Sequence, residues 1–202
     1  MGIKAAVIGV GSMGRNHARL YAELPNVDFV AVSDTNEEIA QNIARKYRVQ
    51  AYSNYEELLE KEKPDAVSVV VPTAMHKEVA SKVMQGGAHV LIEKPIASTV
   101  ADGQALIEEA EELGKKLMVG HIVRFNPAIH LLKKKLDAGE LGKVIQIFSR
   151  RIGPFPARIR DVGVVVDLAP HDIDVMRFLT GESPERVYAE IEQHVHTDYE
   201  DL

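Results

Sequence analysis

The chain has 202 residues, of which 46% are hydrophobic and 27% charged, an ordinary globular composition with enough apolar material for a core. Its net charge of −6, spread over mixed acidic and basic residues, argues against nucleic-acid partners and a polybasic membrane anchor. No apolar run approaches the ~20 residues of a membrane span, and the absence of cysteine excludes disulfides and thiol chemistry. We therefore expect a globular protein with no membrane partner, and a cytoplasmic location is the default.

The first 121 residues alternate between strand-like and helical stretches. Short runs rich in Val and Ile predict strands that are buried on both faces of a sheet. These strands are expected at residues 3–10, 27–34, 65–72, 89–95 and 115–121, with a short stretch at 49–52. Helical spacing is found at residues 13–24, 36–47, 54–61, 76–87 and 99–114. This βαβα rhythm predicts an α/β fold in which residues 1–121 form a doubly wound parallel sheet of Rossmann type.

The pattern changes after His121. Residues 127–139 and 167–181 read as helices, whereas 143–153 and 185–197 alternate as half-exposed strands would. We expect a second, α+β domain over residues 122–202. Because two strands make a poor sheet on their own, we expect this domain to be partial, either as a fragment or by borrowing strands from a partner.

The stretch "GVGSMG" predicts a dinucleotide-binding loop, since it follows the first strand and opens the first helix. Asp34 ends the second strand, where a carboxylate accepts hydrogen bonds from ribose hydroxyls and repels a 2′-phosphate. The expected cofactor residues here are Gly9, Gly11, Ser12, Met13, Gly14 and Asp34. NAD is expected over NADP, although Arg45, Lys46 or Arg48 could still approach a phosphate.

Two more strand ends carry polar residues, in "VPTAMH" and "EKP". Ligands of open α/β sheets bind beyond the carboxyl ends of the strands, so these residues are expected at the cofactor. They are Pro72, Thr73, His76, Glu93 and Lys94. Each of the two motifs also has a purely structural interpretation, because Val-Pro and Lys-Pro sequences commonly just end strands.

The stretch "DLAPHDIDVMRFLTG" repeats Asp167, His171 and Asp174 at spacings that stack them on one helical face. Three ionisable groups there cost free energy unless they are solvated, paired or used in chemistry. Pro170 leaves two possibilities open. In a helix that begins at Asp167 its missing N–H is harmless, but in one that begins near Gly163 it produces a kink.

Five motifs in order carry a family resemblance: "GVGSMG", "VPTAMH", "EKP", "GHIVRFNP" and "DLAPHDID". The chain resembles the glucose-fructose oxidoreductases and inositol dehydrogenases, called Gfo/Idh/MocA, from Ile3 to about Val187. Such proteins join a Rossmann domain to an α/β domain whose open sheet commonly mediates oligomerisation. They move a hydride between a nicotinamide cofactor and a sugar or cyclitol hydroxyl, so the resemblance implies a homo-oligomeric enzyme.

Site roles follow from the resemblance by position. Lys94 would contact the nicotinamide ribose and the reacting hydroxyl, and Asp167 and His171 resemble the paired acid/base residues. Arg124 and Asn126 would lie beside the substrate. These roles suit alcohol oxidation, because the reaction needs a base near the working pH and a cation to stabilise the developing alkoxide.

The stretch "RRIGPFPARIRDVG" looks most like the branch that oxidises nucleotide sugars, in particular UDP-N-acetylglucosamine 3-dehydrogenases. Arg158 and Arg160, with Arg150 and Arg151, would suit a diphosphate, although a solvated basic loop is an equally good interpretation. Other hypotheses are an inositol or free-sugar dehydrogenase, or a catalytically silent NAD-binding module.

The remaining histidines are expected to be structural, except His121, which ends the last expected strand near the cleft and could contact the substrate. His17, His89 and His130 suit surface or helix-packing positions. His194 and His196 alternate on an expected strand without a third ligand nearby, so we expect no metal site.

Overall fold

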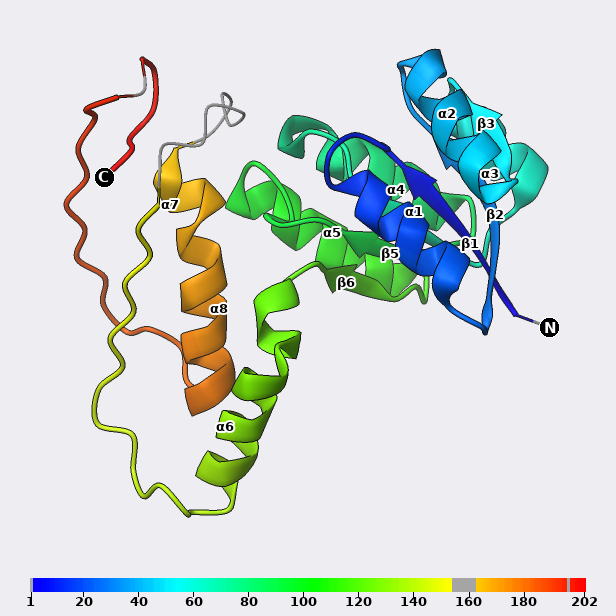
Figure 1. Ribbon diagram of the computed structural model, residues 1–202. Helices are drawn as coiled ribbons and strands as arrows, with labels where there is room; N and C mark the ends of the chain where they lie inside the picture. Colours follow the sequence, from blue (N-terminus) through cyan, green and yellow to red (C-terminus); the bar gives the residue numbers. More distant parts are fainter. Residues whose placement is uncertain (1, 154–162, 196) are drawn as a thin grey trace. The chain divides into compact units, whose positions relative to one another are not determined.

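The computed structural model describes residues 2–153, 163–195 and 197–202. The chain divides into two compact units, Met1–Gly120 and His121–Leu202, each shown in Figure 1. Each unit has its own secondary structure, and each is described separately below.

The first unit is built around one parallel sheet of six strands in the order β3-β2-β1-β4-β5-β6. The strands are β1 (Ile3–Ile8), β2 (Val27–Ser33), β3 (Gln50–Tyr52), β4 (Ala66–Val69), β5 (His89–Ile92) and β6 (Leu117–Val119). The chain winds outward from β1 in one direction and from β4 in the other, which confirms the predicted doubly wound sheet. Such a sheet has its switch point between β1 and β4, where ligands commonly bind.

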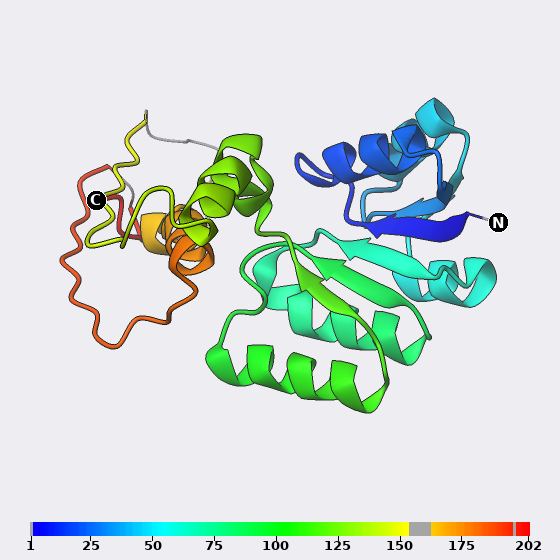
Figure 2. The ribbon, with the colours of Figure 1, turned by 90° about the horizontal axis from the view of Figure 1, so that it is seen from below.

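Helices cover both faces of this sheet, as Figure 2 shows. They are α1 (Gly14–Glu23), α2 (Glu37–Tyr47), α3 (Tyr55–Glu62), α4 (His76–Gln85) and α5 (Val100–Glu112), with a short 3-10 helix, η1 (Thr73–Met75). Leu58, Val79 and Leu106 from α3, α4 and α5 share one core cluster, whereas Ala18 and Ala44 from α1 and α2 belong to the other. The sheet therefore has two apolar cores, one against each face.

The local sequence explains where these elements begin. Asn36, Asn54 and Thr99 precede α2, α3 and α5, and each side chain accepts a hydrogen bond from a first-turn N–H. The strands contain apolar runs because both faces are covered: Ala6 and Val7 of β1 point to opposite faces, and both are fully buried.

The second unit contains helices and irregular segments within the described residues. It has a 3-10 helix η2 (Ile122–Phe125), α6 (Pro127–Asp137), a short α7 (Val164–Asp167) and α8 (Ala169–Thr180). The helix predicted after Pro127 is confirmed, and it packs against α8. Asn126 caps α6 by accepting a hydrogen bond from the Ala128 N–H at 2.9 Å.

The strands predicted at 143–153 and 185–197 are wrong for the residues that the structure describes there, which form no regular secondary structure. Their alternating apolar residues suggested half-buried strands, yet Ile145, Phe148 and Val187 are 94%, 82% and 84% exposed. A strand needs a hydrogen-bonded neighbour, and neither segment pairs as a strand with another described part of the chain.

The helix predicted over 167–181 is interrupted near its start. A first helical segment begins after Gly163 and ends at Asp167, and α8 then begins at Ala169 with Pro170 in its first turn. Proline lacks an N–H and its ring collides with the carbonyl four residues earlier, so it cannot continue a helix that began before Leu168. Asp167 and His171 therefore belong to two consecutive helices.

Candidate functional site

The loop between β1 and α1 closes only because it contains glycines. Gly9 has φ +86°, and a Cβ there would lie 2.3 Å from the Val70 carbonyl oxygen. A Cβ on Gly14 would lie 1.9 Å from the Gly9 carbonyl oxygen, whereas one on Gly11 would meet no atom within 4 Å. The first and third glycines thus permit the tight turn, and the second leaves bare backbone facing open space.

Asp34 is fixed beside this loop by backbone groups. Its Oδ2 accepts a hydrogen bond from the Val10 N–H at 2.9 Å, and its Oδ1 accepts one from the Asn36 N–H at 2.9 Å. The half-buried carboxylate consequently stands at the end of β2, next to the glycine turn. The structure brings together the glycine loop and the acidic residue that the sequence predicted as a pair.

The N-terminus of α1 has no side-chain cap. Met13 occupies the cap position without a capping hydrogen bond, and Ser12 and Met13 are exposed at the tip of the loop. Uncapped helix N-termini present N–H groups and the positive end of the helix dipole. The uncapped helix, the bare backbone at Gly11 and the Asp34 carboxylate together fit a dinucleotide, with the diphosphate at the helix and a ribose at Asp34.

The second predicted group follows β5. Glu93 is only 9% exposed, and its Oε2 accepts a hydrogen bond from the Lys94 N–H at 3.2 Å. Burial by itself would raise the pKa of Glu93, but hydrogen bonding and charge from His17, with the N–H and charge of Lys94, lower the pKa below its usual value. The Lys94–Pro95 peptide bond is cis.

His17 belongs to a polar network that the sequence interpretation missed. Its Nε2 lies 2.9 Å from Glu93 Oε1, and its Nδ1 lies 3.0 Å from Ser68 Oγ, which also bonds the Tyr21 hydroxyl at 2.7 Å. Burial raises the pKa of Tyr21, partly offset by the Ser68 bond. A signal was available: His17 lies three residues after Gly14 and so faces the sheet with it.

His76, predicted near the cofactor, uses its ring within the protein. The side chain is 1% exposed, with Nδ1 2.8 Å from the Pro95 carbonyl oxygen and Nε2 3.0 Å from the Val71 carbonyl oxygen. Pro72 and Thr73, from the same motif, lie at the start of η1. The two strand-end motifs are therefore bonded to each other through this imidazole.

In the second unit, Arg124 is paired with Asp174. Its Nε donates to Asp174 Oδ2 at 2.9 Å and its Nη2 donates to Oδ1, which raises the pKa of Arg124 although burial opposes the effect. The guanidinium also lies 5.5 Å from the ring centroid of Phe178, and His121 Nδ1 lies 3.8 Å from Asp174 Oδ1. Asp174 is thus paired within the fold, and its partner is the predicted substrate residue Arg124.

The predicted acid/base residues of this unit lie in α7 and α8. Asp167 ends α7 and His171 is in the first turn of α8. Arg151 Nε donates to Asp172 Oδ2 at 2.8 Å, which lowers the pKa of Asp172 and fixes the segment before residue 154 to α8. Arg158 and Arg160 lie outside the described residues.

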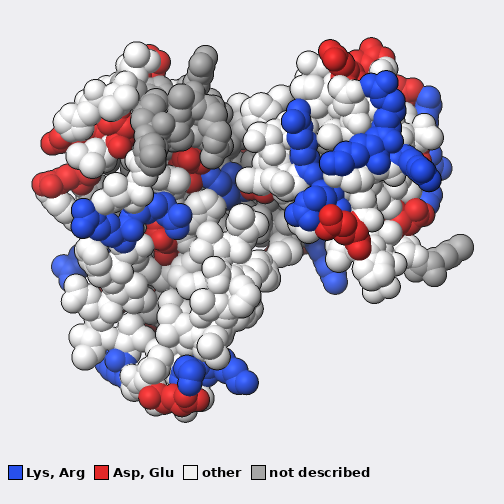
Figure 3. Space-filling view, viewed as in Figure 1, with Lys and Arg blue, Asp and Glu red and all other residues white. Residues whose placement is uncertain are grey.

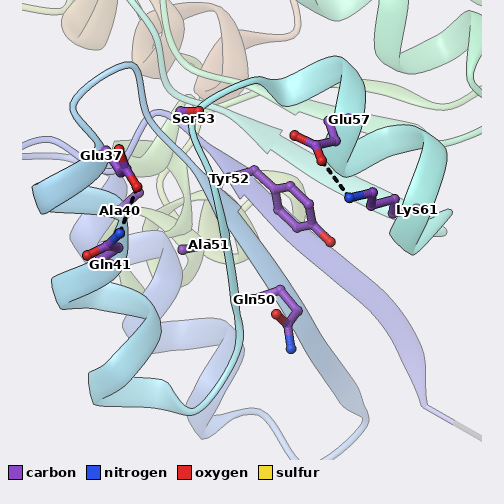
Figure 4. A pocket seen from close by; sticks show the side chains of 9 residues that line it. All are labelled: Glu37, Ala40, Gln41, Gln50, Ala51, Tyr52, Ser53, Glu57 and Lys61. Atoms are coloured by element: carbon purple, nitrogen blue, oxygen red, sulfur yellow. Dashed lines mark hydrogen bonds and ion pairs between the residues drawn. The ribbon is translucent and has the colours of Figure 1, made fainter.

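A cavity of about 340 Å³ lies elsewhere, beside the edge strand β3 (Figure 4). Two pairs of its polar side chains are hydrogen-bonded: Gln41 donates to Glu37 at 2.8 Å and Lys61 donates to Glu57 at 2.5 Å. Neither the glycine loop nor Lys94 lines this cavity. None of the predicted cofactor residues lines this recess, but Asp34 adjoins it, because its N–H donates to the carbonyl oxygen of the lining residue Tyr52 at 3.1 Å.

Neither a metal site nor a membrane-spanning helix is found in the described part of the chain. Within it, no group of three or more His, Asp or Glu side chains is placed to hold a metal ion. None of its helices is both long enough and apolar enough to span a membrane.

Comparison with known proteins defines the family. A model described as an oxidoreductase family with an NAD-binding Rossmann fold matches residues 3–121, which is more than half of the chain. A GFO/IDH/MocA C-terminal domain model matches residues 129–202. The chain belongs to the Gfo/Idh/MocA oxidoreductase family, as the five motifs predicted.

Individual relatives are dehydrogenases by name. The chain is 40% identical to a UDP-N-acetylglucosamine 3-dehydrogenase from Acidithiobacillus ferrooxidans over 93% of its own length and 57% of the relative's. It is 34% identical to a scyllo-inositol 2-dehydrogenase (NAD(+)) from Bacillus subtilis, over 89% and 54% of the two lengths. A solved structure of the Acidithiobacillus enzyme matches with a TM-score of 0.88 at 38% identity, covering 100% of this chain and 61% of that one. The chain thus spans little more than half the length of these curated relatives.

Proposed function

We propose that this chain is an NAD-dependent dehydrogenase that oxidises a sugar hydroxyl, with a nucleotide sugar such as UDP-N-acetylglucosamine, at its 3-position, as the substrate. The observation that carries the proposal is the 40% identity over 93% of the chain with a relative of that name. The glycine loop supports it, because the Asp34 carboxylate is bonded to the loop at Val10 with a 2.9 Å hydrogen bond.

The proposed roles of the two parts of the chain are those implied by the family. Residues 1–121 would bind the dinucleotide, and residues 122–202 would bind the substrate and contribute to a homo-oligomer. Arg158 and Arg160 are the proposed partners of the substrate diphosphate, since a guanidinium group can donate two parallel hydrogen bonds to phosphate oxygens. Asn126, whose side chain caps α6, is proposed beside the substrate through its family motif.

The proposed chemistry assigns one task to each residue. When bound, the nicotinamide supplies the hydride acceptor. His171 would take the hydroxyl proton, and Asp167 would orient its imidazole or bind a second hydroxyl. A cationic Lys94 would stabilise the alkoxide charge that develops as the proton leaves.

NAD is proposed rather than NADP because of Asp34. Basic side chains do gather over α1 and α2 (Figure 3), and Arg45 and Lys46 are among the basic residues of α2. They lie in the last turn of α2, however, whereas Asp34 precedes its first turn. At 1.5 Å per residue this places their backbone roughly 14–15 Å along the helix from Asn36, away from the proposed ribose position.

A second candidate substrate is a cyclitol. The 34% identity with a scyllo-inositol 2-dehydrogenase over 89% of this chain favours it. It would leave the cofactor residues and the proposed roles of Lys94 and His171 unchanged, and only the substrate contacts would differ.

A turnover screen tests the proposal. The purified protein with NAD is offered UDP-sugars, inositols and free hexoses, and formation of reduced nicotinamide is followed by absorbance. We expect turnover of UDP-N-acetylglucosamine. Binding of NAD without turnover of any substrate would instead indicate a silent NAD-binding module.

His171→Ala is the companion variant. We expect it to lower turnover by about a hundredfold or more, as loss of a general base does, while the affinity for NAD changes little. Isothermal titration with NAD measures the affinity independently, and a parallel loss of NAD binding would show that His171 is structural.

A further inference from the structure

Lys94 lies between two residues that each contact a histidine, of which His76 is buried and His17 is partly buried. Glu93, directly before it, contacts His17 Nε2 at 2.9 Å, and the carbonyl oxygen of Pro95, directly after it, contacts His76 Nδ1 at 2.8 Å. The two histidines come from α1 and α4, whose core residues belong to the separate clusters on the two faces of the sheet.

Each imidazole is itself fixed at its other nitrogen. His17 Nδ1 lies 3.0 Å from Ser68 Oγ, and His76 Nε2 lies 3.0 Å from the Val71 carbonyl oxygen. Both second partners belong to β4 or directly follow it, in the middle of the sheet. At His76 both partners are carbonyl oxygens, which can only accept, so we place the ring proton on Nδ1, facing Pro95. A ring held between polar partners has little rotational freedom, because turning it would leave those groups without their hydrogen bonds.

Glu93 transmits this restraint to Lys94 directly. The carboxylate contacts His17 through Oε1 and accepts the Lys94 N–H through Oε2 at 3.2 Å. A Cβ on Gly120 would approach this carboxyl group to 3.3 Å, so the neighbouring strand end also confines it. The backbone on both sides of Lys94 is consequently tied to the rigid centre of the sheet.

We propose that His17 and His76 are positioning residues that fix the Lys94 loop from opposite faces of the sheet, so that the ammonium group is delivered to one place. This inference rests on the proposed function, in which Lys94 acts on the reacting hydroxyl. Misplacement of a catalytic group by about 1 Å can cost on the order of a hundredfold in rate, which is why such restraint matters.

A crossed pair of substitutions separates positioning from general packing. The side-chain nitrogen of Asn reaches roughly the place of a histidine Nδ1, and that of Gln roughly the place of Nε2. At position 17 the bond to the Lys94 loop is made by Nε2, but at position 76 it is made by Nδ1. His17→Gln and His76→Asn thus retain the donor to the loop, and His17→Asn and His76→Gln lose it.

Two measurements are made on all four variants and the wild type. Steady-state kinetics give kcat and KM for NAD, and hydrogen exchange with mass spectrometry follows the amides of Lys94 and Ile96, with peptides of α5 as the internal control. We expect kcat to be about tenfold or more higher for His17→Gln than for His17→Asn, and for His76→Asn than for His76→Gln. KM for NAD should change by less than about threefold, and exchange at Lys94 should be faster only in the variants that lose the donor.

The same order of Asn and Gln at both positions, or no difference between them, would overturn the proposal. So would a rise in exchange that includes the α5 peptides, since that indicates general loosening of the unit. If the wild type oxidises no substrate, the proposed function fails, and the exchange pattern alone still confirms or overturns the anchoring of the loop.

Discussion

Glu93 is a buried carboxylate whose charge is stabilised by three neighbouring groups. Desolvation opposes the charged form, but the bond and charge of His17, together with the N–H and charge of Lys94, outweigh it and lower the pKa of Glu93 below its ordinary value of 4.5. The folded protein therefore binds a proton at this site less readily than the unfolded chain does. Its charged state contributes stability, and that contribution depends on pH.

The pH dependence of stability checks this balance. Because the folded-state pKa is lowered, the contribution is fully present above the ordinary value of 4.5 and is lost as the pH falls through the folded pKa. We expect Glu93→Gln to lower the free energy of unfolding by about 1.5–3 kcal/mol at neutral pH, as loss of a charge-assisted bond does. Urea unfolding over a pH series should show the two proteins converge in acid, and a gap that stays constant would contradict the assignment.

Asp34 decides the proposed cofactor preference. Its carboxylate would repel the 2′-phosphate of NADP, because both groups are negatively charged. Replacing Asp34 should therefore reduce the discrimination between NAD and NADP. We expect Asp34→Ser to lower the ratio of kcat/KM for NAD over NADP by about tenfold or more, equivalent to about 1.4 kcal/mol. An unchanged ratio would rule out a ribose role for Asp34. Asp28→Ser, an exposed change on the same strand, is the matched control.

The β1–α1 turn shows how a whole element can be read from sequence. A strand followed by the glycine pattern and then by a helix predicted a cofactor loop. The structure shows a different physical reason for glycine at each of the three positions. Gly9 needs its positive φ, Gly14 has the Gly9 carbonyl where a Cβ would stand, and Gly11 has nothing there. The fold therefore requires glycine at positions 9 and 14. At position 11, we propose that glycine is required because the diphosphate of the cofactor approaches the backbone there.

Alanine substitutions separate these requirements. Gly14→Ala should destabilise the first unit by several kcal/mol, because its Cβ would lie 1.9 Å from a backbone oxygen and the turn must shift. Gly11→Ala meets no protein atom within 4 Å and should melt near the wild-type temperature, yet it should weaken NAD binding by about tenfold or more through contact with the diphosphate. Thermal melts and calorimetric titration measure the two effects, and equal destabilisation by both variants would contradict this account.

Prediction from sequence succeeded where the periodicity had one physical cause. The central strands β1 and β4 are buried over most of their length, so their apolar runs matched the pattern of a strand covered on both faces, and caps such as Asn54 marked the helix starts. It failed over 143–153 because alternation describes a strand only when a neighbouring strand is present. The His17 network was missed for another reason: its partner Glu93 is 76 residues away, and pairing over that distance depends on the fold.

Within the described residues of the whole molecule, the two units differ in the regular secondary structure that they contain. The first has a continuous sheet with two apolar cores, whereas the described residues of the second contain helices and extended segments with exposed apolar side chains. The proposed dinucleotide residues lie in the first unit, and the proposed acid/base residues Asp167 and His171 lie in the second. The proposed reaction therefore needs both units, and a test of the central claim must report on cofactor and substrate at once.

Isotope transfer is that test. UDP-N-acetylglucosamine carrying deuterium at carbon 3 is incubated with the protein and NAD, and the reduced nicotinamide is analysed by mass spectrometry. The account predicts that the label moves to the reduced cofactor, that turnover slows relative to unlabelled substrate, and that label at carbon 4 does not move. Reduced cofactor without the label, or no reduction with this substrate while NAD binds, would contradict it.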